Sequence, residues 1–338
     1  MAQDLISPDG RPNFGVFTGD VENLSLEGYT PRRMPGVLKR FRAKKWRFAG
    51  LYSKELVAGV AVVHAGYIGS CFAYALHVPT GKIAEYRSQS PLALGCSISD
   101  HALRGQAVFT KGGNRIMYSY GEPGELGQIL VDVKTPSGPL TMRLEMDEAF
   151  GMSWPHQINT PTPGGSFAFT HKTAGNDLTG SIEAPFGEFN FAKGEAFGAI
   201  DHTAGYHDKH WEWRWSSFGG TSIDGRRVGL NLVAPVHHET IMENAMWVDG
   251  KCYPLGEANF EYDPGDVLKP WHITTGDGAV DVVFTPAGQR EETLNVGILM
   301  SRFHQPAGLY SGRLTLPDGQ VVELENVGGV AEEHFARW

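Results

Sequence analysis

The sequence predicts an all-β protein made of two lipocalin-like (calycin-type) halves, each a β-barrel or sandwich. Helix signals are scarce, while glycine (43) and proline (20) are frequent among the 338 residues. Short runs of aromatic and β-branched residues are separated by turn signals such as Pro79-Thr80-Gly81, Asp224-Gly225 and Asp249-Gly250. Short runs at this spacing are typical of sandwiches and barrels, and Asp-Gly pairs suit tight hairpins because glycine readily adopts positive φ.

Strands are expected wherever an apolar run lies between two turn signals. In the first half they are Leu56–His64, Ser70–His77, Arg115–Tyr120, Gly127–Lys134 and Leu140–Met146. In the second half they are Arg227–Val233, Ala245–Val248, Lys251–Pro254, Val280–Thr285, Thr293–Phe303, Leu309–Leu316 and Gln320–Val327.

A weak internal echo predicts that the two halves, placed at 1–155 and 156–338, arose by duplication. The first block reads Trp46-Arg47-Phe48, Gly59-Val60-Ala61-Val62, Phe72-Ala73-Tyr74 and Thr80-Gly81-Lys82. The second reads Trp213-Arg214-Trp215, Gly229-Leu230-Asn231-Leu232, Ala245-Met246-Trp247 and Asp249-Gly250-Lys251. The blocks lie half a chain apart, which favours a duplicated β unit over a solenoid with its period of about 20–50 residues. Chance similarity between β sequences is the alternative.

Composition argues against several classes of protein. The net charge is −9, and the basic stretch Lys39–Arg47 is interleaved with aromatic residues, so nucleic acid is not an expected partner. Cys71, Cys96 and Cys252 are widely spaced without a CxxC pair, which disfavours a disulfide framework. Residues 1–19 lack the pattern of a signal peptide, and no apolar run reaches the roughly 18 residues of a membrane helix. A cytoplasmic protein without stable membrane insertion is expected.

Cofactor-binding motifs are missing from the sequence. There is no Walker loop, no GxGxxG between a strand and a helix, and no GxSxG elbow. Ser99-Asp100-His101 resembles a catalytic triad only in its letters, because adjacent residues do not adopt triad geometry. The sequence therefore predicts no cofactor.

The densest chemical segment runs from Asp201 to Trp215. Trp211, Trp213 and Trp215 alternate, so on a strand all three indoles point to one face. Such a face is either a layer of barrel core or the wall of an apolar pocket, because pocket walls in barrels are core positions left partly unfilled.

The front of this segment, 201–210, is a candidate for proton transfer, since it has no counterpart in the first half. Asp201, His202 and Tyr206 form a plausible acid/base group, although Asp201 could simply satisfy backbone groups in a turn. His202, His207 and His210 are a weaker alternative as metal ligands, because the run crosses an expected loop that does not force them to converge.

Further polar and aromatic residues are candidates for the same site. His64 interrupts an apolar strand near Tyr67, where it is either a fourth acid/base group or a hydrogen-bonded core residue. His237-His238-Glu239 is a polar cluster that could lie at a barrel mouth, although loop exposure is the simpler explanation. The substrate-binding candidates are Trp46, Tyr67, Trp211, Trp213, Trp215, Asn231, Glu243, Asn244 and Trp247.

Several motifs together resemble a bacterial family known as domain of unknown function 2804. They are Lys45-Trp46-Arg47-Phe48, Asp201-x-Thr203-x-Gly205-Tyr206, Trp213-Arg214-Trp215, Gly229-Leu230-Asn231-Leu232, Glu243-Asn244-x-x-Trp247-x-x-Gly250, Gly308-x-Tyr310-x-Gly312 and Gly329-x-x-Glu332-x-His334. The resemblance covers nearly the whole chain and brings no assigned catalytic residues. More distantly, the chain looks like the two-lobed, lipocalin-like group of hydroxyneurosporene synthase, which implies apolar substrates such as isoprenoids.

Two functions of different classes fit these observations. The first is a cofactor-independent lyase, isomerase or hydratase that uses acid/base groups on an apolar or aromatic small molecule. The second is a lipocalin-like carrier with the same hydrophobic ligand and no turnover. A structural role is disfavoured, because the polar groups cluster instead of spreading along the chain.

Overall fold

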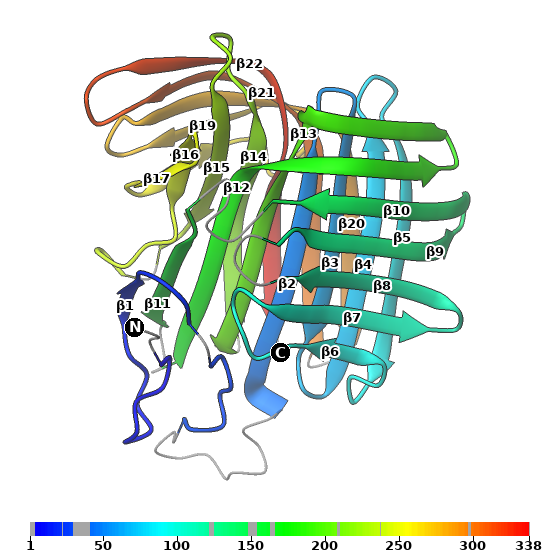
Figure 1. Ribbon diagram of the computed structural model, residues 1–338, viewed down its shortest axis with the longest axis vertical. Helices are drawn as coiled ribbons and strands as arrows, with labels where there is room; N and C mark the ends of the chain where they lie inside the picture. The colour runs from blue at the N-terminus through cyan, green and yellow to red at the C-terminus, as the bar shows by residue number, and fades with distance from the viewer. Residues whose placement is uncertain are drawn as a thin grey trace.

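The computed structural model describes residues 4–21, 23–29, 41–121, 125–147, 154–162, 166–207, 210–236, 238–296 and 299–337. The regular secondary structure of these residues is almost entirely the strands β1–β22, which confirms the all-β class (Figure 1). Lys39, Arg40 and His237 lie outside the described residues. Across the part of the chain that is described, no helix has the length and apolar character needed to cross a membrane.

The first sheet has 13 strands, 11 of which follow one another in the order β5-β4-β3-β2-β13-β12-β10-β9-β8-β7-β6, while β1 pairs with β11 and β11 with β12. It curls into a nearly closed barrel in which β6–β10 cross in front of β2–β5 (Figure 1). Its strands are β1 (Gly15–Phe17), β2 (Ala43–Tyr52), β3 (Leu56–His64), β4 (Ile68–His77), β5 (Lys82–Pro91), β6 (Cys96–Ile98), β7 (Gly105–Lys111), β8 (Asn114–Tyr120), β9 (Gly127–Thr135), β10 (Gly138–Met146), β11 (His156–Thr162), β12 (Ser166–Ala184) and β13 (Gly187–Tyr206).

The second sheet is a half-barrel of nine strands in the order β17-β16-β15-β14-β22-β21-β20-β19-β18. Its strands are β14 (His210–Thr221), β15 (Arg227–Ala234), β16 (Ala245–Val248), β17 (Lys251–Pro254), β18 (Ala258–Glu261), β19 (Trp271–Thr275), β20 (Val280–Val296), β21 (Leu299–Thr315) and β22 (Val321–Arg337). The stretch 293–303, expected as one strand, contains the end of β20 and the start of β21.

The two sheets repeat one arrangement of strands, while their origin by duplication stays a prediction. Each begins with an antiparallel meander of four strands, and the first strand of each meander also pairs with the last strand of its sheet, β2 with β13 and β14 with β22. The echoed glycines occupy matching places, because Gly59 pairs with Gly50 and Gly229 with Gly219. A Cβ on Gly229 would lie 2.4 Å from the carbonyl carbon of Ala174, so the sheets approach closely there.

The long strands β12 and β13 carry the first sheet as far as Tyr206, and the second sheet begins at His210. The change of sheet therefore lies later than the boundary expected between residues 155 and 156. Residues 156–206 belong to the first sheet because β12 pairs with β10, β11 and β13, and β13 pairs with β2. Whether the halves fold as separate domains stays a prediction.

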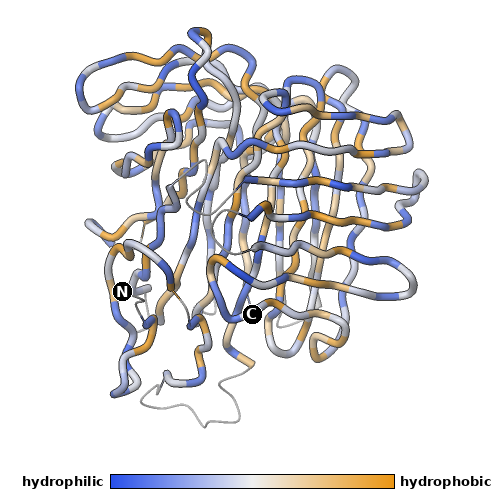
Figure 2. Tube along the Cα trace, in the orientation of Figure 1, coloured by the Kyte–Doolittle hydropathy of each residue, from blue (hydrophilic) through white to orange (hydrophobic). Residues whose placement is uncertain are grey.

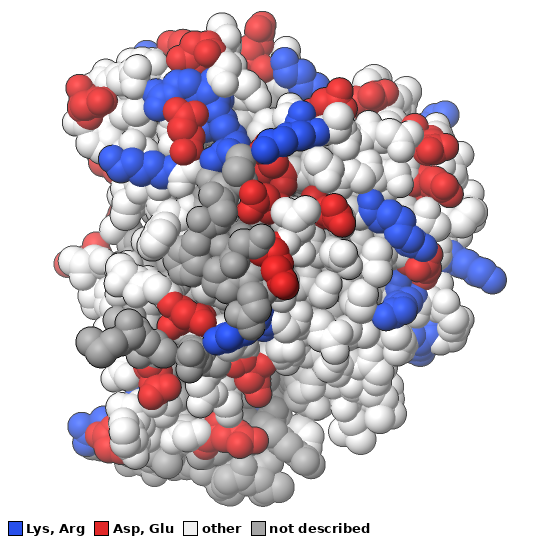
Figure 3. Space-filling model, in the orientation of Figure 1, with Lys and Arg blue, Asp and Glu red and all other residues white. Residues whose placement is uncertain are grey.

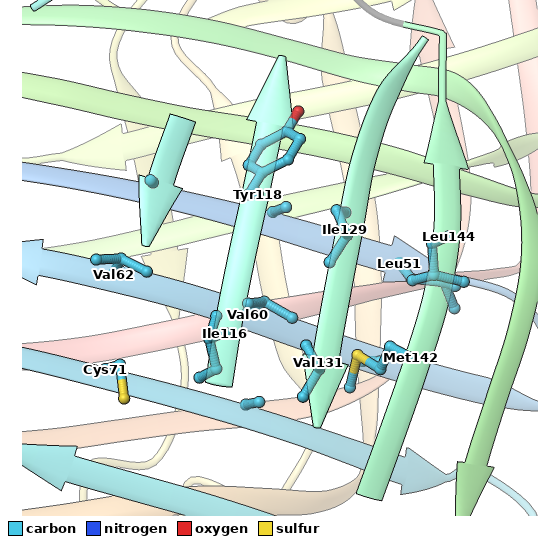
Figure 4. Close-up of a cluster of buried hydrophobic side chains, with 14 of the residues drawn as sticks. Leu51, Val60, Val62, Cys71, Ile116, Tyr118, Ile129, Val131, Met142 and Leu144 are labelled. Atoms are coloured by element: carbon cyan, nitrogen blue, oxygen red, sulfur yellow. The ribbon is translucent and has the colours of Figure 1, made fainter. Parts of the chain in front are cut away.

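Four apolar clusters are found among the described residues, and three of them hold the two-sheet architecture together. One fills the first barrel, where Leu51, Val60 and Val62 face residues of β8–β10 such as Ile116 and Val131 (Figure 4). A second cluster lies in the half-barrel around Trp271. The third joins the two sheets and includes residues of β2 and β14. Apolar and polar positions alternate along many strands, as expected when only one face is buried (Figure 2).

Candidate functional site

A cavity of about 290 Å³ lies between the two sheets, beside the cluster that joins them. This volume is close to the lower end of typical ligand pockets, about 300 Å³. Strands β2–β5, β11–β15 and β20–β22 all contribute to its walls. The cavity is therefore assembled from residues that come from most of the length of the chain, from Trp46 to Arg337.

One wall of the cavity is aromatic, as the alternation of tryptophans predicts. Trp211, Trp213 and Trp215 of β14 all line it. Trp46 of β2 lies across from this strand, with its ring nearly parallel to that of Trp213 (8°) and 6.5 Å away between centroids. His207 stacks on Trp46 at 5.0 Å and meets Trp211 edge-on at 4.9 Å. Such rings offer a large apolar surface with polar N–H groups at its edge.

An ion-paired group lies on the β12–β13 side of the cavity. Lys172 Nζ is 2.7 Å from Asp201 Oδ1 and 3.3 Å from Glu243 Oε2, and Thr203 Oγ1 donates to Asp201 Oδ1 at 3.1 Å. Burial alone would lower the pKa of Lys172, but the two carboxylates raise it overall. Lys172 is thus a buried cation held between two carboxylates.

A buried carboxyl group, Glu332 of β22, faces the same cavity. Its Oε1 accepts a hydrogen bond from Trp213 Nε1 at 2.7 Å, and its Oε2 accepts one from Gln305 Nε2 at 2.9 Å. Burial raises the pKa of Glu332 to about 7, against the lowering effect of these two bonds, and the charge of Asp201 adds to the rise. Near neutral pH this carboxyl exists in both protonation states, which suits a general acid or base.

His334 follows Glu332 by two residues and lines the cavity beside it. Its Nε2 lies 2.9 Å from Ser301 Oγ, and its ring meets Trp213 edge-on at 4.2 Å. Burial, and to a lesser extent the charge of Arg290, lowers the pKa of His334 to about 3, so the imidazole is neutral at physiological pH.

Arg290 adds a buried cation to the β20 side of the cavity. Its guanidinium lies over the rings of Phe72 (3.9 Å) and Phe303 (4.6 Å). It also pairs with Glu85 at 3.0 Å and Glu292 at 2.7 Å. Because Glu85 and Phe72 belong to the first sheet and Arg290 to the second, these contacts join the two sheets next to the cavity.

A family model described as "Domain of unknown function (DUF2804)" matches residues 1–338. The chain belongs to this family. The crystal structure of kievitone hydratase from Nectria haematococca is similar to the chain with a TM-score of 0.47 and 11% identity, over 87% of this chain and 88% of the other. No curated protein matches the sequence.

Three of the four catalytic candidates in this DUF2804 chain point away from the cavity, and only Asp201 faces it. Asp201 and Thr203 line the cavity, so the alternation of β13 turns His202 and Tyr206 to the opposite face. His202 Nδ1 lies 3.0 Å from the carbonyl oxygen of Trp46, and Tyr206 packs against Phe167.

His64 also faces away from the cavity, because its neighbour Val63 lines it. Burial and the charge of Lys45 lower the pKa of His64. Together with Tyr206, His64 borders a separate hollow that includes Lys45 and Asp100.

The substrate-binding candidates divide into two groups. Trp46, Tyr67, Glu243 and the three tryptophans of β14 line the cavity. The remaining three, Asn231, Asn244 and Trp247, hold the surrounding structure instead. Asn231 accepts a bond from Trp215 Nε1 at 2.8 Å, Asn244 accepts one from the amide of Val233 at 2.7 Å, and Trp247 donates to the carbonyl of Trp154 at 2.7 Å.

The alternative metal site is not formed by the residues that the structure describes. His202 faces away from the cavity, His207 stacks between two tryptophans, and His210 is exposed at the start of β14. No group of three or more potential ligands comes together among the described residues. The loop expected between these histidines is largely strand, since β13 extends to Tyr206 and β14 begins at His210.

Sequence reasoning did not select Lys172, Arg290, Gln305, Glu332 or His334, all of which line the cavity. One signal was present, because Glu332-x-His334 belongs to the motifs that carry the DUF2804 resemblance. Its two side chains share a face of β22, as the alternating tryptophans share a face of β14.

Proposed function

We propose that the protein is a cofactor-independent enzyme of the lyase, isomerase or hydratase type that binds a neutral apolar or aromatic small molecule, such as an isoprenoid or lipid, in the cavity between its sheets. Glu332 would transfer the proton. The carrying observation is that a buried carboxyl with a pKa of about 7 faces an aromatic cavity. A carboxyl in this state gives and takes protons at neutral pH without a cofactor.

The Lys172 group supports a separate, electrostatic role. Lys172 is ion-paired with Asp201 and Glu243, which holds these three side chains together at the cavity wall. Fixed charges beside a reacting centre stabilise charge that develops in the transition state. The aromatic faces of Trp213 and Trp46 would stabilise a developing positive charge on the bound molecule.

The surface is consistent with a small-molecule role. On the face shown in Figure 3, Lys and Arg side chains lie next to Asp and Glu side chains and do not form one extended basic surface. Arg226, for example, pairs with Asp249 at 2.8 Å.

The test uses the molecule extracted from protein purified from its own host and identified by native mass spectrometry. Wild type, Glu332→Gln and Glu333→Gln would each be incubated with it in deuterated water. We expect wild type and Glu333→Gln to introduce deuterium into the molecule and Glu332→Gln to lose this activity by at least about 100-fold. Glu333 is a matched control because it follows Glu332 on the opposite face of β22 and pairs with Arg302 at 3.1 Å.

Two outcomes would contradict the proposal. Deuterium incorporation that survives in Glu332→Gln would remove Glu332 from the proton transfer. A bound molecule that returns unchanged from wild type, with no deuterium, would favour the alternative function of a carrier, for which the aromatic cavity alone suffices.

A further inference from the structure

Two buried polar atoms beside Glu332 have no hydrogen-bond partner among the described residues. They are Gln305 Oε1 and His334 Nδ1. Gln305 is 1% exposed and His334 is 9% exposed. A buried polar atom left unpaired costs about 1–3 kcal/mol, so each of these two atoms calls for a partner such as an ordered water or a polar group of a bound molecule.

Both atoms belong to one patch of the cavity wall. Gln305 reaches Glu332 through its Nε2 at 2.9 Å, and His334 lies two residues beyond Glu332 on the same face of β22. His334 is also the direct cross-strand partner of Phe303 on β21. All four side chains line the cavity. Gln305 shares a face of β21 with Phe303, so it lies diagonally across from His334. Diagonal neighbours on antiparallel strands are about 7–8 Å apart, within reach of long side chains, so one small group between them can contact both.

The chemistry of the two atoms restricts what this group can be. Gln305 Nε2 donates to Glu332, so Gln305 Oε1 remains as an acceptor that needs a donor. His334 is neutral, and when its Nε2 accepts from Ser301 Oγ its Nδ1 carries a hydrogen and needs an acceptor. A hydroxyl group donates and accepts at one oxygen atom and satisfies both. A carboxylate or phosphate cannot donate to Gln305 and would lie beside Glu332.

We propose that Gln305 and His334 form a hydroxyl-binding subsite, so that the cavity takes a neutral alcohol or phenol and holds its oxygen next to Glu332. This proposal deepens the proposed function and rests on it for the role of Glu332. The aromatic walls would hold the rest of the molecule, and the two polar atoms would decide how it is oriented.

The test compares two aromatic probes of nearly the same shape, 2-naphthol and 2-methylnaphthalene. Each would displace the neutral fluorescent probe N-phenyl-1-naphthylamine from wild type, Gln305→Leu, His334→Phe and Glu333→Gln. We expect wild type and Glu333→Gln to bind 2-naphthol about tenfold more tightly, as one to two well-made hydrogen bonds allow. In Gln305→Leu and His334→Phe the preference should fall to less than about threefold, while binding of 2-methylnaphthalene shows that the cavity is intact.

Each other outcome has a definite meaning. Equal binding of both probes by wild type would overturn the hydroxyl subsite and leave the proton-transfer proposal standing. A preference that survives in both variants would also overturn it, because the hydroxyl would then bind elsewhere in the cavity. Failure of wild type to bind any of the three probes would overturn the apolar cavity, and with it both proposals.

Discussion

Asp201 and Glu332 occupy equivalent positions in the two sheets of the molecule. Asp201 on β13 lies opposite Phe48 of β2, and Glu332 on β22 lies opposite Trp215 of β14. Because β2 and β14 begin the two repeated meanders, the carboxyl groups sit at matching places on the strands that return to pair with them. The repeated topology thus brings two carboxyl groups to one cavity.

The two carboxyl groups differ in their neighbours on the adjoining strand, which is β12 for Asp201 and β21 for Glu332. Lys172 on β12 lies directly opposite Asp201 and pairs with it at 2.7 Å. The corresponding neighbour of Glu332 is Gln305 on β21, a neutral amide at 2.9 Å. An ammonium group stabilises an ionised carboxylate, whereas burial next to an amide favours the protonated form. One lysine in place of one glutamine thus distinguishes an ion-paired carboxyl group from one that is hydrogen-bonded to neutral groups and whose pKa burial raises.

Removing the buried cation Lys172 from the first sheet should have the largest effect on stability. Lys172→Met leaves Asp201 and Glu243 without their shared counter-charge, and breaking a buried ion pair costs about 3–5 kcal/mol. The free energy of unfolding, measured by urea denaturation at pH 7, should fall by that amount. The matched control is Lys193→Met, because the 74% exposed Lys193 pairs with Asp177 at 3.6 Å and should contribute less than about 1 kcal/mol. Equal losses in the two variants would show that the buried pairs add nothing.

The buried carboxyl group of Glu332, in the second sheet, should make the stability of the protein depend on pH. The pKa of Glu332 rises from an ordinary 4.5 to about 7 on folding, so its contribution to stability is complete below pH 4.5 and is lost as the pH rises through 7. Relative to Glu332→Gln, wild type should lose about 3 kcal/mol of unfolding free energy over this window. Urea denaturation of both proteins from pH 4 to pH 8 measures the difference. Parallel curves would mean that Glu332 titrates alike in the folded and unfolded states.

Much of the architecture could be predicted from the sequence, because turn residues and alternation are local signals. The three tryptophans of β14 share one face of the strand, as their spacing predicted, whereas the spacing left open whether that face was core or cavity wall. The sequence could not decide whether Asp201 or His202 faces the cavity. A shift of one residue exchanges the two faces of a strand, and only the pairing register determines which face is which. Asp201 was also expected near a loop, whereas it lies within β13.

Glu332 could not be predicted from local sequence signals. Glu332 is distant in sequence from Trp213 and Asp201, and its raised pKa comes from burial that only the packing of two sheets creates. The segment 201–210 has no counterpart in the sequence of residues 1–155. Its structural counterpart lies near the C-terminal end of the second sheet, in Glu332-x-His334, where different residue types hide the equivalence from the sequence.

Placing a lysine at the glutamine position would test whether this single difference sets the roles. Gln305→Lys should give Glu332 the kind of partner that Lys172 gives Asp201 and lower its pKa by at least about one unit. The protonated fraction, and any reaction that requires it, would then fall about fivefold at pH 7 and about tenfold at pH 8. Carbon-13 NMR of labelled glutamate carboxyls measures the shift, with Glu332→Gln identifying the resonance. Gln128→Lys, on the exposed face of β9, is the control for an added charge. If the pKa of Glu332 is unchanged in Gln305→Lys, the difference between Asp201 and Glu332 must have a cause other than the residue at position 305.

The smallest effect should come from the indole that donates to Glu332. Trp213→Phe keeps an aromatic ring but removes the 2.7 Å bond from Nε1 to Oε1, which now lowers the pKa of Glu332. The pKa should therefore rise, by about half a unit to one unit for one neutral hydrogen bond. Trp46→Phe alters the equivalent residue of the first half, which lies opposite Thr203, and should leave the titration of Glu332 in place. If both variants shift the carboxyl resonance equally, loss of ring volume in the cavity, and not loss of the N–H donor, would be the cause.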